Sequence, residues 1–168
     1  MNVGLSIPIK DCIIEKYDDV LEDILAHGHT HYVGAGGRGS TKSSFFGGIA
    51  IVLLIMLYKN VHALCFRKVG NTIQNSIYAQ VVWAIYKLGV DSLFHIPKTY
   101  STPIVYKPTG QRIMFMGLDD PNKVKSVKIP FLINVRFVPK FPSSSMSIDP
   151  HSPGIVESST ADTNGLAI

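Results

Sequence analysis

Cysteine is scarce in this chain of 168 residues: only Cys12 and Cys65 are present, far apart in the sequence. So few cysteines exclude a disulfide-stabilised scaffold and favour reduced thiols. Charged residues are also few, at 17%, whereas 46% of the residues are hydrophobic, so the chain as a whole is too apolar to be disordered. The composition therefore predicts one folded domain, or part of a larger one.

Long apolar runs are missing. The longest, Phe45–Tyr58, has 14 residues, including Gly47 and Gly48, whereas a transmembrane helix needs about 20. The first ten residues lack the basic start and the apolar stretch of a signal peptide. We therefore expect a buried helix rather than a membrane span, and a protein of the cytoplasm.

Acidic residues are scarce in the middle of the chain. Residues 1–30 hold two lysines and six acids, whereas residues 31–140 hold fourteen lysines and arginines against three acids, Asp91, Asp119 and Asp120. The last segment, 141–168, has three acids and no lysine or arginine. The basic middle predicts an anionic partner, such as a nucleotide or a nucleic acid, and leaves few residues to hold a divalent metal.

The hydrophobic pattern predicts an α/β fold with a largely parallel sheet flanked by helices. Helical spacing of apolar residues predicts three helices, over Ile13–Leu25, Lys42–Tyr58 and Thr72–Leu88. Short apolar or alternating runs predict strands over His31–Val33, His62–Arg67, Pro103–Lys107 and Gln111–Met116. The last two are joined by Pro108-Thr109-Gly110, which is typical of a hairpin turn.

Three regions follow from this pattern. Residues 1–30 form a lead-in with an amphipathic helix, residues 31–140 form the α/β domain, and residues 141–168 form a tail. The tail has seven serines, three prolines and no aromatic residue after Phe141. Such a segment buries too little apolar surface to offset its ordering entropy, so we expect it to be disordered.

A glycine-rich loop lies between the first predicted strand and the helix from Lys42. It nearly fits the phosphate-binding (Walker A) pattern, in which backbone N–H groups surround a phosphate at a helix start. Thr41 stands where the generic pattern has glycine. Lys42 would reach the β- and γ-phosphates of ATP, and the Ser43 hydroxyl would bind Mg²⁺. The alternative is a flexible loop without a ligand. The candidate phosphate-binding residues are Gly36, Gly37, Gly39, Ser40, Thr41, Lys42, Ser43 and Ser44.

Several separate segments resemble the large terminase subunits of tailed phages and prophages. They are residues 29–33 (HTHYV), 36–44 (GGRGSTKSS), 64–90 (LCFRKVGNTIQNSIYAQVVWAIYKLGV) and 106–128 (YKPTGQRIMFMGLDDPNKVKSVK). The resemblance runs from about Leu5 to Pro130. It implies an N-terminal P-loop ATPase domain of a motor that packages double-stranded DNA into procapsids and also carries a C-terminal nuclease domain.

The same resemblance implies roles and partners. The family commonly carries GSTKS in its loop, as this chain does at residues 39–43. Arg38 matches a loop arginine thought to act on the γ-phosphate. A guanidinium suits that role because it presents a fork of donors to phosphate oxygens; otherwise Arg38 is a solvated loop residue. The implied cofactors are ATP and Mg²⁺. The implied partners are DNA, the portal protein, the small terminase subunit and further copies of the chain on the portal, without a membrane.

An ATPase of this kind needs an acid pair after a buried strand to hold Mg²⁺ and position the attacking water. The residue pattern alone favours Asp119 and Asp120, which follow the apolar run 113–118. The resemblance instead places the pair after a later strand, which here corresponds to 131–140 and contains no acid. We therefore expect that the terminase gene is truncated or frameshifted, and that its product binds nucleotide but hydrolyses it poorly.

Other features have two interpretations each. His27, His29 and His31 alternate and would ligate a metal or form hydrogen bonds at the start of a strand. Tyr78, Trp83 and Tyr86 on the third helix are expected in the core rather than as a platform for bases. The lysines at 123, 125 and 128 form a solvated face or contact DNA phosphates. Cys65 is expected to be a buried small hydrophobe.

Two further hypotheses compete with the ATPase domain. One is a remnant that binds nucleotide or DNA without turnover, and the other is a poorly folded relic without activity. A different P-loop enzyme, such as a helicase, fits the loop but not the segments that follow it.

Overall fold

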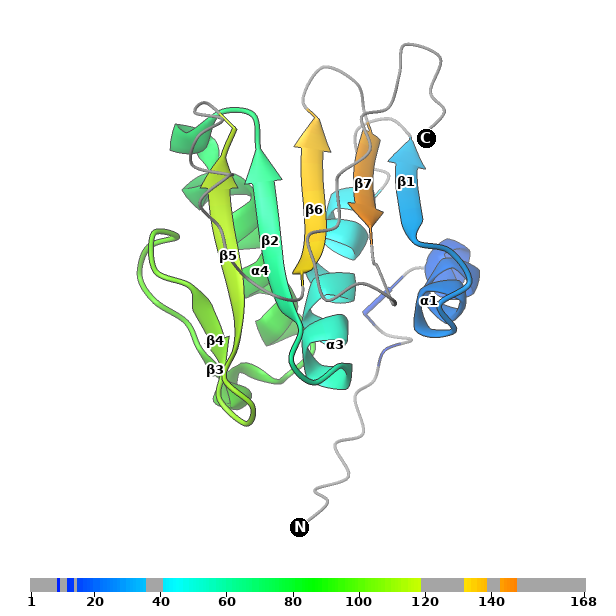
Figure 1. The fold of residues 1–168 in the computed structure, drawn as a ribbon, viewed down its shortest axis with the longest axis horizontal. Helices are drawn as coiled ribbons and strands as arrows, with labels where there is room; N and C mark the ends of the chain where they lie inside the picture. Colours follow the sequence, from blue (N-terminus) through cyan, green and yellow to red (C-terminus); the bar gives the residue numbers. More distant parts are fainter. Residues whose placement is uncertain are drawn as a thin grey trace.

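The computed structural model describes Ile9, residues 12–13, 15–35 and 41–118, and the strands at 132–138 and 143–147. These residues form a sheet of seven strands in the order β1-β7-β6-β2-β5-β4-β3, with helices α3 and α4 packed behind it (Figure 1). The predicted α/β class is confirmed. The strands are β1 (His31–Ala35), β2 (His62–Arg67), β3 (Phe94–His95), β4 (Ile104–Tyr106), β5 (Gln111–Gly117), β6 (Leu132–Val138) and β7 (Ser143–Ser147).

The sheet is mixed, so the expectation of a largely parallel sheet is wrong. β2 lies parallel to β5 on one side and to β6 on the other, whereas the other four neighbouring pairs are antiparallel. The predicted hairpin is confirmed, because β4 pairs with β5 in antiparallel register. The short β3 extends this hairpin at the edge and was not predicted, since two residues carry no periodic pattern.

All three predicted helices are present, each divided into segments with different turns. The first consists of η2 (Glu15–Tyr17) and α1 (Asp18–Leu25). The second consists of α2 (Lys42–Ser44), the π-helical η3 (Phe45–Ile49) and α3 (Ala50–Leu57). The third consists of η4 (Gly70–Thr72), the π-helical η5 (Gln74–Tyr78) and α4 (Ala79–Lys87), followed by the short η6 (Asp91–Leu93).

The apolar run that begins at Phe45 forms a buried helix, as predicted. Every residue from Ala50 to Ile55 is buried, which explains why this segment has no polar face. Within the part of the chain that the structure describes, no helix is both long and apolar enough to cross a membrane.

Strand β2 is buried on both faces of the sheet. Ala63 and Cys65 belong to the main core with the helices, whereas Leu64 and Phe66 pack with methionines of β5 on the opposite face. Burial raises the pKa of the Cys65 thiol, so this side chain stays protonated and inert. The expectation of a buried small hydrophobe at this position is confirmed.

Helix α4 contacts the core through one face only. Val81, Ala84 and Ile85 are buried, and Tyr78, just before α4, is buried as predicted. Trp83 and Tyr86 are 41% and 60% exposed, so placing them in the core was wrong. Residues three and four positions apart lie on the same face of a helix, so positions 81, 84 and 85 form the buried face. Trp83 and Tyr86 lie on the opposite side of the helix.

Strand β7 lies within the tail that was expected to be disordered. It pairs antiparallel with β1 on one side and with β6 on the other. Backbone hydrogen bonds to two strand edges need no apolar side chains, which explains why a serine-rich segment takes this position. The other residues of the tail lie outside the described part of the chain.

Candidate functional site

Four strands end at the same edge of the sheet. β1 and β6 are both antiparallel to β7, and β2 is parallel to β5 and β6, so β1, β2, β5 and β6 all point in one direction. Figure 1 shows their arrowheads at one edge. The chain leaves β1 at this edge and re-enters the described part of the chain at Thr41, where helix α2 follows. Ligands of α/β sheets bind at this kind of edge.

Only part of the predicted phosphate-binding loop is described. Thr41, Lys42, Ser43 and Ser44 form the helix start, and the remaining candidates lie outside the described residues, namely Gly36, Gly37, Arg38, Gly39 and Ser40. Thr41 has φ = 55°, in the left-handed region, directly before the helix. The generic motif has glycine at this position, and a positive φ is the backbone conformation that favours glycine.

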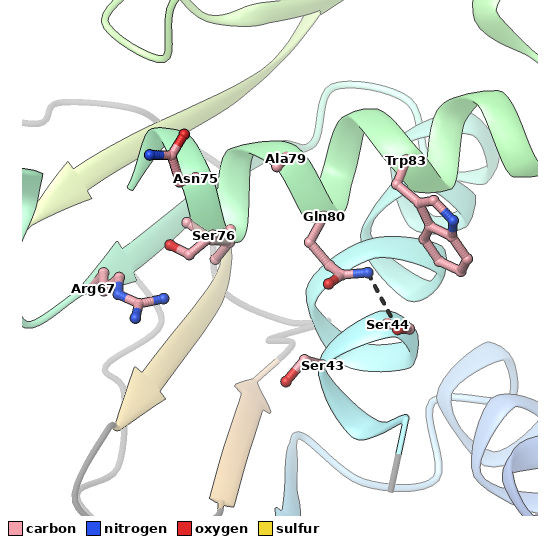
Figure 2. Close-up of a pocket in the computed structure, with 9 residues that line it drawn as sticks. Ser43, Ser44, Arg67, Asn75, Ser76, Ala79, Gln80 and Trp83 are labelled. Atoms are coloured by element: carbon pink, nitrogen blue, oxygen red, sulfur yellow. Dashed lines mark hydrogen bonds between the residues drawn. The ribbon is translucent and has the colours of Figure 1, made fainter. Parts of the chain in front are cut away.

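The two serines of this helix start have different surroundings. The Ser44 hydroxyl accepts a hydrogen bond from Gln80 Nε2 of α4 at 3.2 Å, which ties α2 to α4. Within the described residues no partner holds the Ser43 hydroxyl, which points away from Gln80 into an adjoining pocket (Figure 2). Lys42 is only 8% exposed. Of the two described hydroxyls, that of Ser43 faces the pocket and that of Ser44 contacts α4, and the ligand-binding roles of both serines stay predictions.

The pocket has a volume of about 590 Å³ and lies between the helix start, the end of β2 and helix α4 (Figure 2). Its lining brings Ser43 together with residues that the sequence analysis did not single out. Of these, Arg67 could have been singled out from the sequence, because it is the last residue of a strand that the sequence predicted correctly. The lining residues are Ser43, Ser44, Arg67, Asn75, Ser76, Ile77, Ala79, Gln80 and Trp83.

The described residues do not complete a magnesium site. The pocket lining offers the Ser43 hydroxyl but no carboxylate, and Mg²⁺ is usually held by one or two carboxylates together with phosphate oxygens. No group of three or more histidine, cysteine, aspartate or glutamate residues among the described ones is placed to hold a metal. Asp119 and Asp120 lie outside the described residues, as do the lysines at 123, 125 and 128.

Strand order bears on the two possible positions of the acid pair. Neighbouring strands lie about 4.8 Å apart, so β6, two places from β1, is about 10 Å away, and β5, four places away, is about 19 Å away. An acid pair after β6 would therefore lie much closer to the loop after β1 than one after β5. This geometry favours the position implied by the resemblance over Asp119 and Asp120.

The histidine-rich segment before β1 forms hydrogen bonds rather than a metal cluster. The Asp23 carboxylate accepts hydrogen bonds from the Tyr32 hydroxyl at 2.6 Å and from His29 Nδ1 at 2.8 Å. His31 Nδ1 lies 2.8 Å from the Thr30 hydroxyl. These contacts connect the end of α1 to the start of β1, which agrees with the hydrogen-bonded interpretation of His29 and His31. The His27 ring lies against the Tyr58 ring instead, with the ring centroids 5.0 Å apart.

Comparison with known proteins decides the family. A family model described as phage terminase large subunit matches residues 28–138. The chain belongs to this family. It is 34% identical over 131 residues to the terminase large subunit of Bacillus phage SPP1, which covers 78% of this chain and 28% of that protein. It is 32% identical over 117 residues to the PBSX phage terminase large subunit of Bacillus subtilis (strain 168), which covers 68% of this chain and 26% of that protein.

The match shows how much of its relatives' length this terminase chain spans and how far along the chain the family likeness extends. It spans about a quarter of the length of these curated relatives. The family match continues to residue 138 and therefore includes β6, so the expectation that the likeness stops near Pro130 is wrong. β6 was judged to be outside the family because it is not followed by acids, although its backbone pairs with β2 over six residues.

The hydrogen bonds to Asp23 predict a pH-dependent stability. The bond from Tyr32, followed by the bond from His29, holds the pKa of Asp23 below its ordinary value of 3.8. A lowered folded pKa contributes stability that is complete above the ordinary value and is lost as the pH falls through the folded value. We expect the difference in unfolding free energy between wild type and Asp23→Asn to shrink in this acidic range, as measured by urea unfolding across pH.

Tyr32→Phe is the matched variant for this experiment. It removes the Tyr32 hydrogen bond, the larger of the two causes of the lowered Asp23 pKa, and keeps the carboxylate. It should therefore reduce the acid dependence of the unfolding free energy without abolishing it. A wild type and an Asp23→Asn variant whose curves run parallel down to pH 2 would contradict the assignment.

The backbone of Thr41 predicts a second result. A residue with a β-carbon in the left-handed region costs about 1–2 kcal/mol, whereas introducing glycine costs about 0.4–1 kcal/mol through the unfolded chain. Thr41→Gly should therefore keep or raise the unfolding free energy, by up to about 1 kcal/mol. Ser43→Gly, at the second residue of α2, is the control and should lower it by about 0.5 kcal/mol, the difference in helix propensity between serine and glycine. An equal decrease of the unfolding free energy in both variants would contradict the assignment of backbone strain to Thr41.

Proposed function

We propose that this chain is the nucleotide-binding part of a terminase ATPase domain and that it binds ATP at the helix start after β1. The observation that carries the proposal is the position of Lys42 and Ser43, which follow a glycine-rich loop at the sheet edge where four strands end, beside a pocket of about 590 Å³. Membership of the terminase family supports the assignment, since its motors use ATP.

The proposed contacts follow from side-chain chemistry. The Lys42 ammonium binds the β- and γ-phosphates as a point charge, and the backbone N–H groups of the loop surround the phosphate chain. The Ser43 hydroxyl is the proposed protein ligand of Mg²⁺, which also binds phosphate oxygens. Arg38 is proposed to contact the γ-phosphate from the loop.

The proposal includes binding with poor turnover. Phosphoryl transfer to water needs a carboxylate to position the attacking water and another to hold the metal. The sequence from Phe131 to Lys140 contains β6 but no aspartate or glutamate. Without these carboxylates, this chain can hold ATP in place but lacks the groups that accelerate its hydrolysis. The hypothesis of a frameshifted gene stays a prediction, which translating all three frames past the codon for Pro130 would test.

The partners of the complete motor are proposed by family membership. They are double-stranded DNA, the portal protein, the small terminase subunit and further copies of the chain. The fourteen lysines and arginines against three acids in residues 31–140 support an anionic partner such as DNA. In the complete motor, ATP hydrolysis would drive DNA into the procapsid.

A thermal-shift experiment with the full chain tests nucleotide binding. At 100 times the dissociation constant, a ligand that binds only the folded state stabilises it by about 2.7 kcal/mol, so MgATP should raise the Tm by several degrees. Lys42→Ala should abolish this shift. Each variant is compared with itself with and without MgATP, because Lys42 is buried and its replacement also changes the stability of the free protein.

Lys59→Ala is the control, because Lys59 is exposed at the other end of the same helical segment. It should keep the full MgATP shift. Phosphate release measured on the wild type should stay near the background rate. A wild type without any MgATP shift would overturn the proposed function, and rapid phosphate release would overturn the proposal of poor turnover.

A further inference from the structure

Arg67 is the cation of the pocket beside the proposed ATP site. It is the last residue of β2 and lines the same pocket as Ser43, although the two lie on different elements (Figure 2). Among the described residues of the lining none is acidic. Among the described residues no carboxylate or carbonyl group binds the Arg67 side chain. A guanidinium that lines a pocket and has no acidic neighbour among the described lining residues is suited to an anionic ligand.

The backbone of Arg67 is held in place from both sides. It pairs with Gly117 of β5 and with Phe137 of β6 in the parallel part of the sheet. Its carbonyl oxygen accepts a hydrogen bond from the Leu118 N–H at 2.9 Å. The side chain therefore extends from a fixed point, and only its own torsions need ordering when it binds a ligand.

The other polar groups of the lining are mostly engaged. The Ser76 hydroxyl donates to the Thr72 carbonyl oxygen at 2.6 Å, and Gln80 donates to Ser44. Figure 2 shows Asn75 and Ser76 above Arg67, and Ser43 on the other side of the pocket. Among the described lining residues, the Ser43 hydroxyl and the Arg67 guanidinium are thus open to a ligand, together with the Asn75 amide and the Trp83 indole N–H.

We propose that Arg67 binds the terminal phosphate of the nucleoside triphosphate from the side opposite Lys42. This inference rests on the proposed function. β2 lies three places from β1 in the sheet, about 14 Å away, so Arg67 approaches from beyond the end of β6. Because Arg67 and Ser43 line the same pocket, a phosphate chain held at the helix start would extend into the space that Arg67 also faces. Arg67 would therefore distinguish ATP from ADP.

Binding of two probes by the full chain tests this proposal. The probes are Mg²⁺ with the non-hydrolysable ATP analogue AMP-PNP, and Mg²⁺ with ADP, measured by titration calorimetry. Arg67→Gln keeps much of the side-chain length and removes the charge. It should weaken AMP-PNP binding by roughly ten- to a hundredfold, as for a lost hydrogen bond to a charged group, and change ADP binding less than about twofold. Arg67→Lys should show a partial loss, because it keeps the charge without the fork.

Arg112→Gln is the matched control, because Arg112 is an exposed arginine of the neighbouring β5 and does not line the pocket. It should bind both probes like the wild type. Equal weakening of AMP-PNP and ADP by Arg67→Gln, or no change in either, would overturn the proposal. Unfolding of each variant is followed in parallel, and Arg67→Lys provides the test if Arg67→Gln loses its cooperative transition.

A DNA duplex at low and high salt is the third probe, since a phosphodiester offers the same anionic oxygens. Loss of salt-dependent duplex binding in Arg67→Gln, with unchanged AMP-PNP binding, would assign the pocket to DNA and overturn the proposal. If the wild type binds neither nucleotide, the proposed function itself fails. If Lys42→Ala abolishes nucleotide binding and Arg67→Gln leaves it unchanged, only the role of Arg67 fails.

Discussion

The structure depends on the burial of β2 on both faces and its pairing on both edges. Its central residues alternate between two apolar clusters, and its neighbours β5 and β6 are both parallel to it. Parallel neighbours cannot be joined by tight turns, so the chain has to cross over a face of the sheet between them. The helix from Gly70 belongs to the crossover from β2 to β5, and the helix from Lys42 connects β1 to β2, which point the same way but are not neighbours. Each helix begins near the sheet edge that carries the candidate site.

Close packing between the two crossover helices positions the site. A β-carbon on Gly48 of η3 would lie 3.0 Å from both the Ala84 β-carbon and the Gln80 carbonyl oxygen. The absence of a side chain at Gly48 lets the helices approach, and this approach brings Gln80 within hydrogen-bonding distance of Ser44. Ser44 is thereby fixed on α4, and the preceding residue, Ser43, turns its hydroxyl toward the pocket. A glycine in the apolar run thus influences a residue of the proposed phosphate site.

Local patterns predicted the elements that depend on local physics. The strand at His62–Arg67 was predicted to the residue, because an apolar run bounded by polar residues on both sides has few other solutions. The helices followed from apolar spacing in the same way. Strand direction could not be predicted, since it depends on which distant edge each strand meets. β7 illustrates this point, because serine-rich sequence gives no signal for a strand and its pairing comes from two distant edges.

The same difference between local patterns and distant contacts applies to the candidate site. Lys42 and Ser43 could be proposed from the sequence because the phosphate-binding pattern is contiguous. Arg67 was missed because its relevance comes from a pocket formed by three separate elements. The exposure of Trp83 was missed because helical spacing gives the period of the buried face but not how wide that face is.

Strand order also bears on the proposed separation of nucleotide binding from hydrolysis. The groups proposed to bind phosphate come from the helix start after β1 and from the end of β2, and β6 lies between them in the sheet. By strand order, the end of β6 lies between the ends of β1 and β2, where the terminal phosphate is proposed to bind, whereas the end of β5 lies on the far side of β2. Because the sequence after β6 continues with Pro139 and Lys140 rather than with acids, the strand order supports the proposal that this chain binds a nucleotide without turning it over efficiently.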